Sequence, residues 1–283
     1  MKNPETISYP AAMTVAGSDS GGGAGIEADL RTFNAFGVFG TAVIAAITAQ
    51  NPCEVTGVEG ISPEMVEKQL RAVFAKIAVR ALKTGMLFSR EIILATAKVL
   101  RERPHLVVVD PVMVSTSGAR LLCEDAVATL EEELLPLAEW ITPNLPEAEL
   151  LLGRRLENEA AWVRAVGDLS EKFGACVVLK TGHAGGNAKQ AVDFVAMEDG
   201  IYELGSPRIA LPDKYVAHGT GCTFSAALAA GFALEMEPEE ALRAAKGFVY
   251  GSLLEPVDLG GGLMAMYPPQ ESYEARTFFR KKQ

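Results

Sequence analysis

The sequence predicts an α/β protein whose central sheet is mostly parallel and is flanked by helices on both faces. Short apolar runs rich in β-branched residues recur along the chain, which is typical of strands buried on both faces. Longer stretches with helical spacing and charged faces separate these runs, and such alternation indicates a parallel sheet. The chain has 283 residues, 49% of them hydrophobic, and contains no obvious linker, repeat or low-complexity tract. We therefore expect a single domain over residues 1–283.

Five apolar runs define the predicted strands, at residues 13–16, 41–48, 105–111, 140–143 and 176–182. Stretches with helical spacing predict the clearest helices, at residues 26–37, 63–77, 90–103, 124–138 and 157–173. Residues 189–210 resemble a hairpin that turns at Glu198-Asp199-Gly200. We expect residues 51–62 to form a short flap or an edge strand.

Composition argues against several classes of function. The net charge of −10 disfavours sequence-independent nucleic-acid binding, which depends on Lys and Arg neutralising phosphates. The N-terminus has no apolar signal-peptide core. The strongest apolar run, residues 38–49, is shorter than the roughly 20 residues that a membrane span needs. We therefore expect a soluble protein that binds neither nucleic acid nor a membrane.

The cysteines and histidines form no metal-binding pattern, because they are scattered and include no CxxC pair. They are Cys53, Cys123, Cys176, Cys222, His105, His183 and His218. We expect reduced thiols and a cytoplasmic protein.

A glycine-rich loop, GSDSGGGAG at residues 17–25, follows the first predicted strand. Its spacing fits neither common nucleotide motif. A P-loop counted from Gly17 requires a lysine where Gly23 stands, and the dinucleotide motif counted from Gly21 requires a small residue where Ile26 stands. The loop therefore predicts a ligand site without identifying the ligand.

Polar or glycine-rich segments follow most of the predicted strands. They are GSDSGGGAG at 17–25, AQN at 49–51, KTGML at 83–87, DPVM at 110–113, TPNLPEAE at 142–149 and KTGHAGG at 180–186. Ligands of open parallel sheets bind beyond the carboxyl ends of the strands. We therefore expect most of these segments to meet at one edge of the sheet.

The most informative stretch is HGTGCTFSAALAAGFALE, residues 218–235. Gly219 and Gly221 allow successive N–H groups to point at one spot, where the dipole of the following helix also stabilises an anion. In the first turn of that helix the same field lowers the pKa of Cys222 and favours the thiolate. Cys222 could then accept a proton from an attacking hydroxyl while the amides stabilise phosphoryl charge. Alternatively, Cys222 only fills space in a glycine-rich turn.

Two carboxylates at strand ends suit a hydrated Mg²⁺. Asp110 closes one predicted strand, and Glu147 lies three residues after Asn144 at another strand end. Such a pair can organise the ion and its waters. Helix capping explains Glu147 equally well, because Asn144 and Glu147 fit the N-cap and N3 pattern.

Two lysines at strand ends each allow two interpretations. Lys180 could reach a phosphate, or its stem could follow apolar surface so that its charge reaches solvent. The same choice exists for Lys83, and there we favour the solvent-directed side chain.

Taken together, six segments resemble the ribokinase-like superfamily, in the family order. They are GSDSGGGAGIEADLRTF, ITAQN, KTGML, DPVMVSTSG, TPNLPEAE and HGTGCTFSAALAAG. Within it, the chain is most similar to the hydroxymethylpyrimidine/phosphomethylpyrimidine kinases of thiamine biosynthesis, over residues 13–255. The resemblance implies a ribokinase-like fold with its core at about 13–255, and a homodimer. It also implies ATP- and Mg²⁺-dependent phosphorylation of 4-amino-5-hydroxymethyl-2-methylpyrimidine, then of its monophosphate.

The resemblance also implies residue roles. Gly219, Thr220, Gly221 and Cys222 would form the anion hole, with Cys222 in place of the Asp that other members use as base. The substrate would contact Gly17, Gly23, Asp29, Gln50, Met86 and Val112, the ATP phosphates would contact Asn144, Lys180 and Thr181, and Mg²⁺ would be held by Asp110 and Glu147. Without the resemblance, Asp29 would be interpreted as a solvated carboxylate on an amphipathic helix, and Gln50 as a strand-end amide bonded to backbone.

The chain departs from the family pattern at several positions outside the anion hole. Gly21 replaces a common Ser, Glu27 replaces Gln, Thr116 replaces a frequent Lys, and Val216-Ala217 replace Asn-Thr. The change at position 116 removes an additional phosphate contact.

Three other functions compete with this interpretation. Pyridoxal kinases share the fold and chemistry; Cys222 in place of Asp favours the pyrimidine kinase, although some relatives with Cys phosphorylate both substrates. A non-catalytic pyrimidine-binding sensor is opposed by the retention of Cys222, Glu147 and the GTGC loop. A nicotinamide-dependent oxidoreductase is opposed by the unmatched dinucleotide motif.

Overall fold

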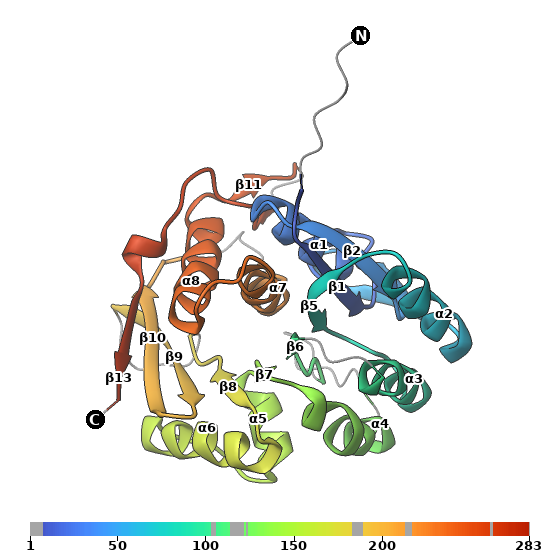
Figure 1. Ribbon diagram of the computed structural model, residues 1–283. Helices are drawn as coiled ribbons and strands as arrows, with labels where there is room; N and C mark the ends of the chain where they lie inside the picture. The colour runs from blue at the N-terminus through green and yellow to red at the C-terminus, as the bar shows by residue number, and fades with distance from the viewer. Residues whose placement is uncertain are drawn as a thin grey trace.

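A twisted sheet runs through the centre of the computed structural model, with helices on both of its faces (Figure 1). The structure describes residues 8–102, 106–113, 122, 124–182, 189–212, 217–260 and 263–282. Nine of the described strands form the main sheet, in the order β13-β10-β9-β8-β7-β6-β5-β1-β2. Of the residues named above, His105, Thr116, Cys123, His183 and Val216 lie outside the described ranges.

The part of the sheet from β8 to β2 is parallel throughout, as the alternation of elements predicts. Its strands are β1 (Ala11–Ala16), β2 (Phe39–Ile44), β5 (Val79–Thr84), β6 (Leu106–Val109), β7 (Trp140–Ile141) and β8 (Cys176–Leu179). Their carboxyl ends therefore lie at one edge, where the polar segments follow.

An antiparallel extension completes the sheet. β9 (Gln190–Met197) and β10 (Gly200–Pro207) form a hairpin that pairs Met197 with Gly200, so the predicted hairpin and its turn are confirmed. β9 pairs with β8, and β13 (Phe278–Lys281) pairs with the outer side of β10. β13 is not among the predicted strands.

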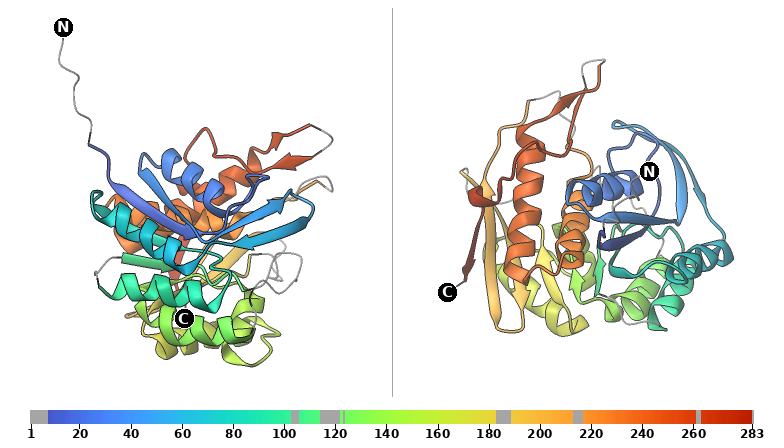
Figure 2. Two further views of the ribbon diagram at one scale, coloured as in Figure 1. Left: turned by 90° about the vertical axis from the view of Figure 1, so that its right-hand side faces the viewer. Right: turned by 45° about the horizontal axis from the view of Figure 1, so that its top comes forward.

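The predicted strand at 41–48 divides into two. β2 ends at Ile44, and after Ala45 the chain leaves the main sheet as β3 (Ala46–Gln50). β3 pairs with β4 (Val55–Gly60) in a separate antiparallel ribbon, which we call the flap. This confirms the flap expected within residues 51–62. The flap and the short hairpin of β11 (Val257–Asp258) and β12 (Met264–Ala265) project from the same side of the molecule (Figure 2).

Helices pack on the two faces of the sheet through separate apolar clusters. One face carries α2 (Pro63–Phe74), α3 (Arg90–Arg101), α4 (Glu124–Thr129), α5 (Leu145–Leu152) and α6 (Glu159–Phe173); the other carries α1 (Gly25–Ala35), α7 (Thr220–Ala233) and α8 (Pro238–Leu254). The helix predicted at 124–138 changes pitch, through η1 (Leu130–Leu134) and η2 (Leu135–Leu137), because Pro136 has no N–H to continue it. A further short turn, η3 (Glu274–Arg276), precedes β13.

Side-chain caps fix where several helices begin. Ser62 and Ser89 accept hydrogen bonds from the backbone N–H groups of Met65 and Ile92, which start α2 and α3. α6 ends at Gly174, whose φ of 66° lies in the left-handed region that favours glycine. None of the helices in the described ranges is both long and apolar enough to cross a membrane.

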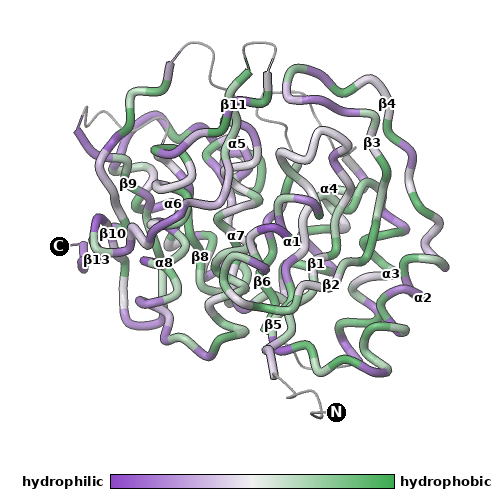
Figure 3. The backbone as a smooth tube through the Cα atoms, turned by 90° about the horizontal axis from the view of Figure 1, so that it is seen from above, coloured by the Kyte–Doolittle hydropathy of each residue, from purple (hydrophilic) through white to green (hydrophobic). Residues whose placement is uncertain are grey.

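α7 is buried on almost every side, between the sheet, α1 and α8, and it reads as a run of small and apolar residues (Figure 3). At Gly231 an added Cβ would lie 2.9 Å from Cβ of Ala241, so glycine allows α8 to approach closely. Because α7 crosses β5 and β6, its N-terminus reaches the edge where the parallel strands end.

Candidate active site

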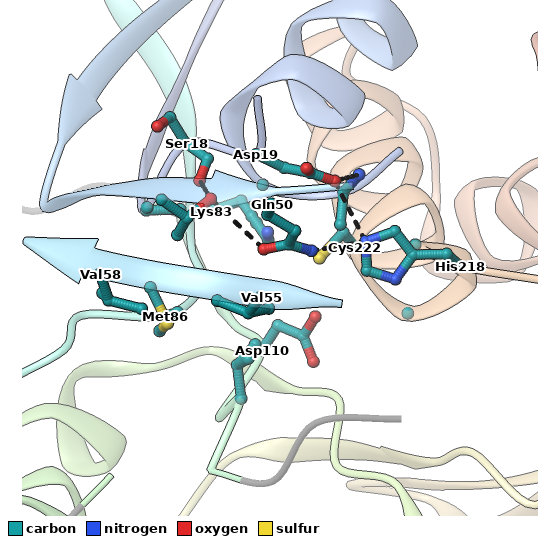
Figure 4. A pocket seen from close by; sticks show the side chains of 18 of the residues that line it. Ser18, Asp19, Gln50, Val55, Val58, Lys83, Met86, Asp110, His218 and Cys222 are labelled. Carbon is teal, nitrogen blue, oxygen red and sulfur yellow. Dashed lines mark hydrogen bonds and ion pairs between the residues drawn. The ribbon is translucent and has the colours of Figure 1, made fainter. Parts of the chain in front are cut away.

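A cavity opens at the carboxyl edge of the sheet, between the flap and the N-terminus of α7 (Figure 4). Residues from all of the predicted strand-end segments line it, which confirms that these segments converge. From the predicted site set, the lining contains Gly17, Gln50, Met86, Asp110, Val112, Asn144, Glu147, Lys180, Gly219, Gly221 and Cys222. The described lining lacks Gly23, Asp29, Thr181 and Thr220.

Gly219 and Gly221 shape the start of α7. Gly219 has φ of 85°, and an added Cβ would lie 1.9 Å from the carbonyl oxygen of Gly23. At Gly221 an added Cβ would lie 3.0 Å from Nζ of Lys180. These glycines therefore bring the 17–25 loop and a lysine close to the helix N-terminus, where free N–H groups favour an anion. Thr220 opens the helix, but its side chain does not line the cavity.

Cys222 lies in the first turn of α7 and faces the cavity. Burial raises the pKa of its thiol. The nearby Lys83 and the backbone of Gly25 lower that pKa, while Asp29 and Asp110 raise it, and the net pKa lies above the ordinary value. This corrects the expectation that the helix N-terminus makes a thiolate here, because desolvation of the charged form is the larger effect.

Lys83 is fully buried rather than directed to solvent. Its Nζ donates to both carboxylate oxygens of Asp29, at 3.1 and 2.9 Å, and Asp29 also accepts a 2.6 Å hydrogen bond from Thr14. Burial would lower the pKa of Lys83, but Asp29, Cys222 and Asp110 raise it above its ordinary value. Lys83 therefore carries a positive charge at the wall of the cavity.

The predicted substrate contact of Asp29 needs correction. Its side chain is 0% exposed, and both of its oxygens are bonded to Lys83. Burial raises the pKa of Asp29 above its ordinary value, and Lys83 and Thr14 reduce that rise. Asp29 thus acts as the counter-charge of Lys83 and supports the cavity from behind.

A second charged group lies at the ends of β6, β7 and β8. Nζ of Lys180 donates to Oδ1 of Asp110 at 2.8 Å, and the exposed fraction of the Lys180 side chain is only 16%. Lys180 therefore does not extend to solvent. Burial would lower its pKa, but Asp110 and Glu147 raise it above the ordinary value, so Lys180 is a cation facing the cavity.

The helix-capping interpretation of Glu147 is confirmed. Its side chain accepts a hydrogen bond from the backbone N–H of Asn144 at 2.8 Å, and its own N–H donates to Oδ1 of Asn144 at 3.0 Å, which is a complete capping box. The other oxygen accepts from the backbone N–H of Met113 at 3.3 Å. Glu147 also lines the cavity. Burial raises its pKa to about 7, against a lowering effect of Lys180.

These carboxylates fit Mg²⁺ better than a metal that needs a full protein cage. Within the described residues, no three His, Cys, Asp or Glu side chains gather in a way that would hold a metal. Mg²⁺ commonly uses one or two carboxylates together with waters and substrate phosphates. Asp110 and Glu147, both facing the cavity beside Lys180, offer such a set.

Thr181 does not reach the cavity, which corrects its predicted phosphate contact. Its hydroxyl donates to the carbonyl oxygen of Val192, and its N–H donates to Oδ1 of Asp193 at 2.8 Å. Nζ of Lys246 pairs with Oδ2 of the same Asp193 at 2.6 Å. Thr181 therefore anchors the end of β8 to β9, while the preceding Lys180 faces the cavity.

Asp19 organises the 17–25 loop, and it is not among the predicted site residues. Its buried carboxylate accepts backbone hydrogen bonds from Gly21, Gly23 and Ala24 at 2.8 to 3.0 Å. Oε2 of Glu27 in turn accepts the N–H of Asp19 at 2.7 Å. An Asp that precedes a turn of glycines is typical of such side-chain-to-backbone bonds, so the pattern could have pointed to this role.

The flap supplies the opposite wall. Thr48, Gln50, Val55 and Val58 face the cavity from β3 and β4. The backbone N–H and carbonyl of Gln50 bond to the hydroxyl of Ser20 at 2.8 and 2.7 Å, so the flap is fastened to the 17–25 loop.

Apolar contacts complete the wall beneath the flap. Val112 has φ of 25°, a strained backbone for a β-branched residue, and it lines the cavity with Met86. An added Cβ at Gly17 would lie 2.6 Å from Cε of Met86, so Gly17 makes room for this side chain.

The chain is similar in sequence and structure to several known kinases. The sequence model of a family described as phosphomethylpyrimidine kinase matches residues 19–267. A hydroxymethylpyrimidine/phosphomethylpyrimidine kinase of Rhizobium meliloti is 47% identical, over 89% of this chain and 94% of that protein. The structure of a Clostridium difficile phosphomethylpyrimidine kinase has a TM-score of 0.74 at 39% identity, over 85% of this chain and 97% of that one. A Staphylococcus aureus pyridoxal kinase in complex with AMP-PCP has a TM-score of 0.85 at 29% identity, over 97% and 100%.

The Lys83–Asp29 pair yields a prediction about stability. Lys83→Met leaves a buried carboxylate without its counter-charge, and we expect the free energy of unfolding to fall by about 3–5 kcal/mol. Asp29→Asn combined with Lys83→Met removes both charges, so the double variant should be more stable than Lys83→Met alone. Urea denaturation of the wild type and the variants measures this. A loss below about 1 kcal/mol in Lys83→Met, or strictly additive effects, would contradict the pairing.

Glu147 yields a prediction about pH. Its pKa of about 7 in the folded protein exceeds its ordinary 4.5, so between these values the folded state holds a proton that the unfolded state releases. Wild-type stability should therefore fall relative to Glu147→Gln as the pH rises from about 4.5 to about 7, by roughly 1–3 kcal/mol. Gln retains the capping-box pattern. Unfolding curves at several pH values test this, and a constant difference between the two proteins would disprove it.

Proposed function

The chain belongs to the phosphomethylpyrimidine kinase family, and we propose that it transfers the γ-phosphoryl group of ATP to 4-amino-5-hydroxymethyl-2-methylpyrimidine and then to its monophosphate. One observation carries the proposal: a single cavity is lined by Gln50 from the flap, by Cys222 at the N-terminus of α7, and by Lys180 beside Asp110. The Gln50 amide can bind a heteroaromatic ring, and Cys222 can take the proton of its hydroxymethyl group. Lys180 can bind the anionic phosphoryl donor.

In the proposed mechanism the ring occupies the space between Gln50, Met86 and Val112, with Gly17 at its edge. The side-chain amide of Gln50 can donate and accept hydrogen bonds, and Met86 and Val112 provide apolar walls. Such a combination suits a small flat ligand. Asn144 and Lys180 face the phosphates, and the charge of Lys180 attracts them.

The chemical step is an in-line displacement. The substrate hydroxyl oxygen forms a bond to the γ-phosphorus, the bond from that phosphorus to the bridging oxygen of ADP breaks, and the hydroxyl proton passes to Sγ of Cys222. The amides of residues 219–222 stabilise the charge on the transferring group. Lys83 assists because its charge favours the thiolate against burial. Cys222 thus serves as base, and positioning and electrostatics supply most of the rate enhancement.

Mg²⁺ is part of the proposal. Asp110 and Glu147 would hold it, with Asn144 close to Glu147. When bound, the ion neutralises phosphate charge. Glu147 presents its carboxylate for this purpose only when it is deprotonated.

We also propose that the chain forms one kinase domain, is located in the cytoplasm and assembles as a homodimer.

Pyridoxal kinase is the second candidate, supported by the likeness to the Staphylococcus aureus enzyme. Identity is higher to proteins named as phosphomethylpyrimidine kinases, at 47% and 39%, which favours the pyrimidine.

The function is tested by coupled release of ADP from ATP and Mg²⁺, with the hydroxymethylpyrimidine, its monophosphate and pyridoxal offered separately. We expect turnover of both pyrimidines. Turnover of pyridoxal alone would replace the proposal by the second candidate, and turnover of all three would extend it to dual specificity. Folded protein that binds the pyrimidine without consuming ATP would instead be a sensor.

Removal of the base tests the mechanism. We expect Cys222→Ala to lower kcat by roughly 10²–10⁴-fold, the usual effect of losing a general base, with little change in the KM for the pyrimidine. Because the pKa of Cys222 lies above its ordinary value, wild-type kcat should rise with pH above 7, and this rise should vanish in the variant. Cys53→Ala, at an exposed thiol on the flap, is the matched control. Near-normal turnover in Cys222→Ala would exclude the base assignment.

A further inference from the structure

His218 lies between the two ends of the cavity and has no part in the mechanism above. It directly precedes Gly219, and its side chain lines the cavity. Nε2 of His218 lies 2.8 Å from Nε2 of Gln50 and 3.1 Å from Oδ2 of Asp19 (Figure 4). One ring nitrogen thus contacts two neighbours, and this restricts the hydrogen-bonding state of all three.

Asp19 fixes the proton on Nε2. Three backbone N–H groups, those of Gly21, Gly23 and Ala24, donate to the Asp19 carboxylate, and this set of donors favours its ionised form. Burial raises the pKa of Asp19, but the hydrogen bonds keep it below its ordinary value. A carboxylate accepts hydrogen bonds and donates none. Nε2 of His218 must therefore carry the hydrogen and donate it, whether the ring is neutral or positively charged.

This proton decides the orientation of the Gln50 amide. The oxygen and nitrogen of an amide have nearly the same shape, so their hydrogen bonds assign them. A protonated Nε2 cannot accept a bond from the Gln50 nitrogen. The oxygen and nitrogen of the amide therefore exchange places relative to Figure 4, so that Oε1 of Gln50 faces His218. The amide nitrogen then lies at the other end of the group.

Thr48 independently supports the same orientation. The far end of the Gln50 amide lies 3.3 Å from Oγ1 of Thr48. The single proton of that hydroxyl is already donated to the carbonyl oxygen of Ser18 at 2.8 Å. The hydroxyl can only accept from Gln50, so a nitrogen belongs at that end. All four groups are satisfied in this arrangement, and in the reverse one both contacts of the amide are unfavourable.

We propose that His218 is a positioning residue that determines specificity: it holds the Gln50 amide so that one N–H remains free to donate to an acceptor atom on the ligand. A ring nitrogen with a free lone pair is such an acceptor. Without the His218 proton, the amide can turn by 180° and offer oxygen in place of nitrogen. The identity of the ligand rests on the proposed function, whereas the orientation of the amide does not.

Gly23 allows the His218 ring to occupy this place. An added Cβ at position 23 would lie 2.8 Å from Cδ2 of the ring, closer than side-chain atoms pack. Gly23 was expected to contact the substrate, but the described cavity lining does not include it. Its effect on the ligand would pass through His218.

Binding without ATP tests the proposal. Calorimetry would measure the Kd of 4-amino-5-hydroxymethyl-2-methylpyrimidine, and of two analogues that each have one ring nitrogen replaced by C–H, for the wild type, His218→Leu, His218→Gln and Gly23→Ala. We expect the wild type to discriminate against one analogue by about 3- to 10-fold, the value of one hydrogen bond. His218→Leu and Gly23→Ala should lose this discrimination. His218→Gln should retain it, because its terminal N–H can replace the imidazole donor.

A second measurement needs no variant. The ¹⁵N chemical shifts of histidine in the wild-type protein report which ring nitrogen of His218 carries the hydrogen, and we expect Nε2. An unprotonated Nε2, or unchanged discrimination in His218→Leu, would overturn the proposal. A merely structural role would weaken all three ligands equally in His218→Leu and lower its Tm, with no rescue by Gln. If the wild type binds the pyrimidine without phosphorylating it, the proposed function fails and the role of His218 can still be judged.

Discussion

The buried ion pair between Lys83 and Asp29 is the interaction on which the site depends. Two charges withdrawn from water are tolerated only when they meet in good geometry, so β5 and α1 must pack in one register. Thr14 adds β1 to the same contact. The loop that joins β1 to α1 and the loop that follows β5 are thereby held at fixed positions, and both line the cavity. The same pair leaves a positive charge beside Cys222, which favours its thiolate.

Much of this architecture follows from local features of the sequence. Buried strands, their polar carboxyl ends, the 189–210 hairpin and the glycines before α7 are all set by residues close together in the chain. The ion pair is not, because it joins residues 54 positions apart in the chain. The spacing does contain a signal: Asp29 lies in register with Ile26 and Phe33 on the buried stripe of α1, and Lys83 follows Ala81 and Leu82 in a buried strand. Opposite charges at buried positions of neighbouring elements are expected to meet.

One other difference concerns the direction of side chains. Lys180 and Thr181 are neighbours in one motif, but the Lys180 side chain lines the cavity, whereas the N–H and hydroxyl of Thr181 bond to the adjacent strand β9. The raised pKa of Cys222 has a different cause. Proximity to a helix N-terminus can be recognised from sequence, whereas the desolvation that opposes it depends on how the assembled fold buries the thiol. Burial of this kind is a property of the assembled fold alone.

Glycines in the 17–25 loop and at the start of α7 allow close backbone contacts, which neither segment indicates by itself. GSDSGGGAG looks like a loop left open for a ligand, yet a Cβ at Gly25 would lie 2.5 Å from the carbonyl oxygen of Gly17, and one at Gly219 would lie 1.9 Å from that of Gly23. Both positions have positive φ, at 60° and 85°. These glycines therefore admit another part of the chain rather than a ligand. The 17–25 loop and the start of α7 interlock as one unit, which His218 extends to the flap through Gln50. The flap end and the α7 end of the cavity are consequently built on a shared backbone contact, which fixes the position of Gln50 relative to Cys222.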